Sequence, residues 1–131
     1  MTDLRLHDAA ASDDAAAIRS LLAAGAKVDT CDETGRTPLL VAAQVNGVRA
    51  AEALITAGAD VNAKDRIEDS PYLYAGARGH DVILAMTLAH GADPRSVNRY
   101  GGTAPIPAAE RGQRGRDFVA MEAALVQAGA R

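Results

Sequence analysis

The stretch GRTPLLVAA, residues 35–43, decides the fold because it joins a helix start to an apolar run. Thr37 is a good N-cap residue, since its side-chain oxygen can accept a hydrogen bond from a free N–H group of the first turn. Pro38 follows at the first helical position, where the missing N–H costs nothing. The same start recurs as Ser70-Pro71, and a third start, Thr103-Ala104, follows at the same interval. The sequence therefore predicts a short helix that is repeated along the chain.

A second signal keeps the same period. Gly25, Gly58 and Gly91 are evenly spaced by that interval, and Gly129 follows after a slightly longer one. A glycine directly after a helix supplies the left-handed residue that a C-cap requires. The pattern predicts second helices at about residues 48–57 and 81–90, so each period holds two helices. Turns are expected at Asn46-Gly47 and Gly79-His80.

Composition indicates how these helices pack. The 131 residues are enough for one domain, with 48% hydrophobic residues but only 3% aromatic ones, and alanine fills about 30 positions. Such a core must come from thin helices that approach closely. A single helix pair of this size cannot bury its apolar face alone, whereas stacked pairs bury a continuous slab.

Residues 35–43 and the stretch GADVNAK, residues 58–64, resemble the two recurring motifs of the ankyrin repeat. The period of that repeat, about 33 residues, matches the spacing of the helix starts and of the glycines. The resemblance covers about residues 4–131 and is of the bacterial type. It implies an all-α ankyrin-repeat solenoid of four stacked helix–turn–helix units with protruding turn fingers. We expect one domain over residues 1–131, with units at about 4–31, 32–64, 65–97 and 98–131.

The first and last units depart from the pattern in ways that are typical of caps. Asp8 stands where the next units have Val41 and Tyr74, so that flank must face water. Glu122 stands at a position that is apolar in the other units, which indicates that no further unit packs on it.

Two further departures affect local shape. Glu68 replaces the finger glycine represented by Gly35, and a non-glycine residue is costly at positive φ. We therefore expect that finger to differ from its neighbour. Pro107 falls inside the predicted first helix of the last unit and predicts a distorted helix there.

No catalytic, metal-binding or cofactor-binding constellation stands out. The three histidines, His7, His80 and His90, belong to different repeats without metal-ligand spacing, and each is interpreted as structural. Cys31 is a lone thiol near a finger tip. The glycines are isolated helix terminators and form no phosphate-binding motif. We expect no cofactor and no enzymatic activity.

Charge and hydropathy narrow the partners. The net charge of −3 and the pI of about 5.5 disfavour nucleic-acid binding, which needs a strongly basic face. No apolar run reaches the ~18–20 residues of a bilayer span, and the amino end has no signal-peptide pattern, so the cytoplasm is the default compartment and no membrane partner is expected.

The resemblance implies that finger tips and the exposed side of the first helices form a concave surface that binds another protein. Interface residues are enriched in Arg and Tyr, and we expect the arginines here to match an acidic patch on the partner. By alignment, the candidate partner-binding residues are Glu33, Arg36, Arg66, Ile67, Asp69, Arg78, Arg99, Tyr100 and Arg111.

Two other functions stay open at this point. The chain could be an accessory or inhibitory subunit of an enzyme complex, or a structural protein that associates with itself. We expect the isolated chain to be a monomer, which light scattering can test.

Overall fold

The structure, a computed structural model, describes residues 3–97 of the chain. That range contains six α-helices and no strand, which confirms the all-α prediction. The helices are α1 (Arg5–Ala11), α2 (Ala15–Ala23), α3 (Pro38–Val45), α4 (Val48–Thr56), α5 (Pro71–Arg78) and α6 (Asp81–Ala89). The predicted fourth unit, with Glu122 and Pro107, lies outside the described residues.

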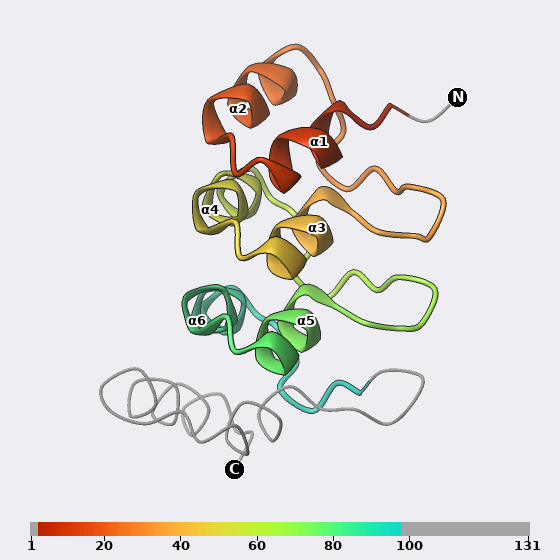
Figure 1. Cartoon of the computed structure of the whole chain (residues 1–131), viewed down its shortest axis with the longest axis vertical. Helices are drawn as coiled ribbons and strands as arrows, with labels where there is room; N and C mark the ends of the chain where they lie inside the picture. The colour runs from red at the N-terminus through yellow and green to blue at the C-terminus, as the bar shows by residue number, and fades with distance from the viewer. Residues whose placement is uncertain (1–2, 98–131) are drawn as a thin grey trace.

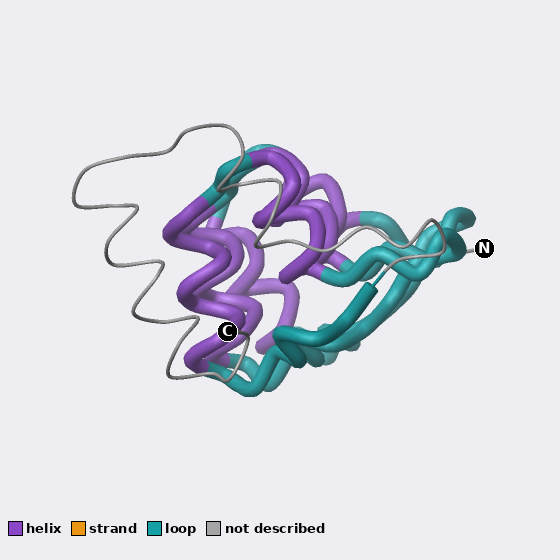
Figure 2. Tube along the Cα trace, turned by 90° about the horizontal axis from the view of Figure 1, so that it is seen from below, coloured by secondary structure: helices purple, strands orange, loops and turns teal. Residues whose placement is uncertain are grey.

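The helices form stacked antiparallel pairs (Figure 1). The first helices α1, α3 and α5 make one column, and the second helices α2, α4 and α6 make the other, each packing on its neighbours along the column. Two loops project to one side of the stack (Figures 1 and 2). We call residues 26–36 the first finger and residues 59–69 the second finger.

The helix ends follow the sequence signals. The Thr37 hydroxyl accepts a hydrogen bond from Leu40 N at 3.2 Å, and the Ser70 hydroxyl accepts one from Leu73 N at 3.2 Å. Gly58 ends the α4 turn with a φ of +95°, a left-handed conformation that glycine adopts without a Cβ penalty. The predicted helix-capping residues are therefore confirmed, and α4 and α6 end within a residue of the predicted positions.

Alanines stand among the larger aliphatic side chains of the buried core. Ala42, Ala43, Ala50, Ala51 and Ala75 are all 0% exposed. Because alanine projects only a methyl group, the helix axes can approach closely, and many small contacts replace a few large ones. This arrangement confirms the prediction of thin stacked helices.

Polar side chains join consecutive units. The carboxylate of Asp29 accepts a hydrogen bond from Asp60 N at 3.1 Å, and Asn62 Oδ1 accepts one from Asp93 N at 2.9 Å. On the other side of the stack, the His80 ring donates from Nδ1 to the Ala43 carbonyl at 2.8 Å. Each unit is therefore fixed to the next by packing and by side-chain bonds to backbone groups.

The second finger does not differ in backbone shape, so the prediction for Glu68 is wrong. Glu68 has a φ of +65°, and Gly35 has a φ of +80° at the same place in the first finger. Both residues donate from backbone N to a carbonyl three residues earlier at 3.0 Å, Asp65 for Glu68 and Asp32 for Gly35. The surrounding hydrogen bonds hold the turn in shape, so Glu68 adopts a positive φ although that conformation is strained for a glutamate.

Within residues 3–97, none of the helices has the length and hydropathy needed to cross a bilayer.

Candidate functional site

The predicted partner-binding residues lie on the two fingers and at the end of α5. Glu33 and Arg66 are exposed on the first and second finger, and Arg78 is exposed in the last turn of α5. Ile67 is half-buried, and Asp69 is 8% exposed, so its side chain offers a partner little surface. Arg99, Tyr100 and Arg111 lie outside the described residues.

Arg36 braces the first finger against α3. Its Nε donates to Asp32 Oδ2 at 2.8 Å, and its Nη1 donates to Gln44 Oε1 at 2.8 Å. The side chain remains 37% exposed. Arg36 therefore fixes the finger in place while keeping part of its guanidinium at the surface.

Asp32 organises the same finger. Its carboxylate accepts hydrogen bonds from Thr34 N, Thr34 Oγ1 and Arg36 N, each at 2.9 Å. Burial alone would raise the pKa of Asp32, but the hydrogen bonds from Arg36 and Thr34 together lower it to about 2. The carboxylate is thus charged at neutral pH and holds the finger turn closed.

Asp65 has the corresponding role in the second finger. Its Oδ1 accepts hydrogen bonds from Ile67 N and Asp69 N, both at 3.0 Å. Its Oδ2 accepts a hydrogen bond of 2.6 Å from the Tyr74 hydroxyl of α5. Burial and then the contact with Asp65 raise the pKa of Tyr74, so its hydroxyl stays protonated and remains the donor.

Arg78 is held in a fixed orientation on α5. Its guanidinium carbon lies 5.8 Å from the centroid of the Tyr74 ring, within cation–π range. Its Nη1 donates to the Gln44 carbonyl of α3 at 3.3 Å. The structure therefore presents an exposed cation that is already ordered by two neighbouring units.

The two fingers lie beside each other. Arg66 N donates to the Thr34 carbonyl at 3.1 Å, which joins the second finger to the first near their tips. The Gln44–Arg78 bond joins the same two units at α3 and α5.

The histidines have structural partners, as their interpretation from the sequence requires. His7 donates from Nε2 to the Arg36 carbonyl of the next unit at 2.7 Å. His90 donates from Nδ1 to the Met86 carbonyl at 2.9 Å, one turn earlier in α6. Among residues 3–97, no group of three or more His, Cys, Asp or Glu side chains is arranged to hold a metal ion. Cys31 is an exposed free thiol.

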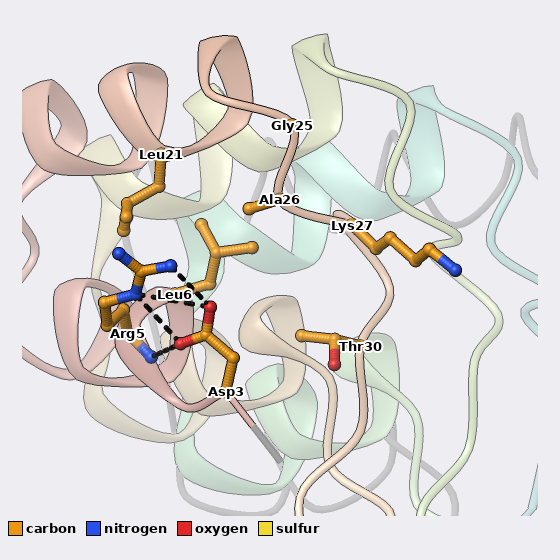
Figure 3. A pocket seen from close by; sticks show the side chains of 8 residues that line it. All are labelled: Asp3, Arg5, Leu6, Leu21, Gly25, Ala26, Lys27 and Thr30. Atoms are coloured by element: carbon orange, nitrogen blue, oxygen red, sulfur yellow. Dashed lines mark hydrogen bonds and ion pairs between the residues drawn. The ribbon is translucent and has the colours of Figure 1, made fainter. Parts of the chain in front are cut away.

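A hollow of about 260 Å³ lies at the amino-terminal end of the stack (Figure 3). Leu6, Leu21 and Ala26 line it, and the Asp3–Arg5 ion pair, with an N···O distance of 2.8 Å, lies at its edge. The side-chain hydrogen bond from Arg5 lowers the pKa of Asp3 to about 2. Both charged side chains are largely exposed, so this pair covers the end of the stack rather than forming a reactive site.

Sequence reasoning missed the residues that hold the surface in shape. Asp32 and Asp65 stand one repeat period apart, and that spacing was the available signal. The hydrogen bond from Tyr74 to Asp65 was missed because it joins an exposed loop to a helix. The role of Arg36 as a brace was also missed.

Comparisons with known proteins agree with this architecture. The family model of ankyrin repeats in three copies matches residues 6–98. The chain is 57% identical to an ankyrin repeat domain from Acinetobacter baumannii whose crystal structure is known, with a TM-score of 0.82. The match covers 92% of this chain and 61% of that one, so the chain spans less than two thirds of its structural relative. No curated protein matches the chain. The chain therefore belongs to the ankyrin-repeat family and is of the bacterial type, a family whose repeats are generally non-enzymatic protein–protein interaction modules.

Proposed function

We propose that the chain docks a partner protein on a concave docking face, formed by the fingers and the exposed side of the first helices. The observation that carries the proposal is the fixed, exposed guanidinium of Arg78, held by the Tyr74 ring and the Gln44 carbonyl. A side chain ordered before binding loses little entropy when it meets a partner. The docking face comprises Glu33, Arg36, Arg66, Ile67, Arg78, Arg99, Tyr100 and Arg111, and Asp69, which is 8% exposed, adds little surface to it.

The partner's surface in this proposal carries an acidic patch. Arg66 and Arg78 are exposed within the described units, and Arg99 and Arg111 stand at the corresponding positions of the next unit in the sequence. Arginine suits such a surface because its planar guanidinium forms bidentate pairs with carboxylates. Complementary charge steers the encounter and selects the partner more than it adds affinity.

In this proposed role the chain catalyses no reaction of its own, and the isolated chain is a monomer in the cytoplasm. The single cysteine supports a reducing compartment, because no intramolecular disulfide can form. The histidine side chains of the described units donate to backbone carbonyls, which supports a structural rather than a catalytic use.

Affinity capture from the native organism tests the docking face. The bait variant Arg66→Asp/Arg78→Asp should lose a specific partner that wild type recovers, because two cations become anions opposite an acidic patch. Arg49→Asp is the matched control, since Arg49 is an exposed arginine on α4, on the second-helix side of the stack. Circular dichroism establishes that each bait is folded. Equal recovery by folded wild type and double variant would contradict the proposal.

A further inference from the structure

Glu68 occupies a backbone conformation that favours glycine. Its φ is +65°, in the left-handed region, at the place where the first finger has Gly35. The chain has two other left-handed non-glycine residues, Asp13 and Asn46, among those the structure describes. Asp and Asn tolerate this region because their short side chains bond locally, whereas glutamate has no such compensation. Glu68 therefore costs folding free energy that a glycine would spare.

The Glu68 side chain lies at the surface of the second finger. It is exposed, and it takes part in neither the Asp3–Arg5 nor the Arg36–Asp32 ion pair of residues 3–97. Asp13 provides the contrast, because its Oδ1 accepts a hydrogen bond of 2.7 Å from Ala50 N in the next unit. Strained backbone conformations of this kind cluster at binding and active sites.

Glu68 lies among residues of the proposed docking face. It lies on the second finger beside Arg66 and Ile67, on the side of the stack where both fingers project (Figure 1). From the second finger onward, the exposed docking-face residues that the structure describes, Arg66 and Arg78, are both cations. Glu68 is an anion beside these two cations. A partner whose acidic patch binds the arginines would therefore need a positively charged side chain opposite Glu68.

We propose that Glu68 is a specificity-determining residue of the docking face and that it pairs with a lysine or arginine of the docked protein. The inference rests on the proposed docking function and adds the sign of one partner group to it. The surrounding arginines bind the partner's acidic patch, and Glu68 admits only partners with a cation at one place in that patch. Glu68 is exposed on the second finger, and its cost in stability is offset there by selectivity.

A phage-displayed library of random 12-residue peptides, selected on the full chain, supplies defined probes. Peptides that bind wild type and fail to bind the Arg66→Asp/Arg78→Asp variant are kept as docking-face ligands. Their affinities are then measured for Glu68→Gln, which removes the charge and keeps the strain, and for Glu68→Gly, which removes both. Glu52→Gln is the matched control, because Glu52 is an exposed glutamate on α4.

We expect both Glu68 variants to bind these peptides at least fivefold more weakly, while Glu52→Gln stays within twofold of wild type. Replacing the peptide's Lys or Arg by Met should remove the difference between wild type and Glu68→Gln. Thermal unfolding should separate the two variants, because Glu68→Gly raises the midpoint by about 4 °C and Glu68→Gln leaves it unchanged.

The outcomes separate this inference from the function on which it rests. If docking-face peptides are recovered but bind all three Glu68 forms within twofold, the inference is overturned and the docking function stands. If no peptide depends on Arg66 and Arg78, the docking function itself fails. Peptides that prefer Glu68→Gln would also overturn the inference, because an anion would then oppose binding.

Discussion

Single residues determine the backbone conformation at the helix ends and in the finger turns. The glycines after α2, α4 and α6 could be predicted as left-handed from their spacing alone, because an L-residue rarely adopts that conformation. The same reasoning failed at Glu68, where the residue type indicated a different turn. A hydrogen-bonded finger fixed at both ends costs more to reshape than one strained residue costs to keep. Residue type is thus a weaker predictor where tertiary bonds determine the turn.

Tyr72 is a second residue-scale feature, and its unpaired hydroxyl is the part that the sequence alone did not reveal. It stands where the other units have Leu6 and Leu39, and it is 1% exposed. Its hydroxyl is buried and makes no hydrogen bond. Burial, together with the charge of Asp93, raises the pKa of Tyr72 to about 12 from an ordinary value of 10.0.

Tyr72→Phe should therefore stabilise the protein. The substitution keeps the ring packing and removes a polar group that is desolvated without a partner, so we expect a gain of about 1 kcal/mol in urea unfolding at pH 7. The advantage should grow above pH 10. The pKa of Tyr72 is higher in the folded state than in the unfolded state. The stability linked to this difference is therefore present below the unfolded pKa of 10.0 and is lost as pH rises toward the folded pKa of about 12. A loss of stability at pH 7 would mean that the hydroxyl has a hydrogen-bond partner in solution.

At the scale of elements, the two fingers share one design with different chemistry. In each finger, an aspartate accepts hydrogen bonds from the finger backbone. Its Oδ2 also accepts a hydrogen bond, from Arg36 in the first finger and from Tyr74 in the second. The helices could be predicted from caps and periodicity because those signals are local in sequence. The finger contacts could not, because Tyr74 is nine residues from Asp65 and belongs to a different element.

Asp32 makes the first finger sensitive to acid. Its pKa of about 2 in the fold lies below the ordinary value of 3.8, so its contribution to stability is present above pH 4 and is lost as pH falls toward 2. Because the Asp32 side chain is only 9% exposed, solvent screens its hydrogen bonds little. The shift corresponds to about 2 kcal/mol. Asp32→Asn should be less stable than wild type at pH 7 by about that amount.

The difference between wild type and Asp32→Asn should shrink between pH 5 and pH 2, because the asparagine does not titrate. Chemical unfolding measured across this pH range tests the point. Asp29→Asn is a suitable control, since Asp29 also accepts a backbone hydrogen bond but lies exposed between units. A constant difference across the range would show that the charge of Asp32 is not what closes the finger.

At the scale of the whole molecule, stability comes from contacts between neighbouring units. The repeat period predicted this stack, because units in phase must present the same faces to each other. The bonds between units were not predicted, since Asn62 and Asp93 lie 31 residues apart and meet only through the stacking. Their spacing repeats that of Asp29 and Asp60, which is the signal that a search for paired polar residues could have used.

Asn62→Ala should loosen one junction and leave the others intact. It removes the bond from Asn62 Nδ2 to the Gly91 carbonyl, of 3.0 Å, and the bond from Asp93 N to Asn62 Oδ1. Because Asn62 is exposed, we expect a loss of about 1 kcal/mol in total.

Hydrogen exchange should locate that loss. Amide protection should fall at Asp93 and in α6, while the amides of α1 and α2 keep their wild-type exchange rates. Equal loss of protection in every helix would instead mean that the described units open only as a single cooperative block.

The side-chain ladder from Asp29 to Asp60 and from Asn62 to Asp93 has a mechanical consequence. Each of these hydrogen bonds joins a unit only to its immediate neighbour, so a pulling force along the stack is resisted by separate junctions rather than by one shared contact. Under tension the junctions break one after another. Each release frees one whole repeat, or roughly 110 Å of extended chain, so the stack lengthens in regular steps.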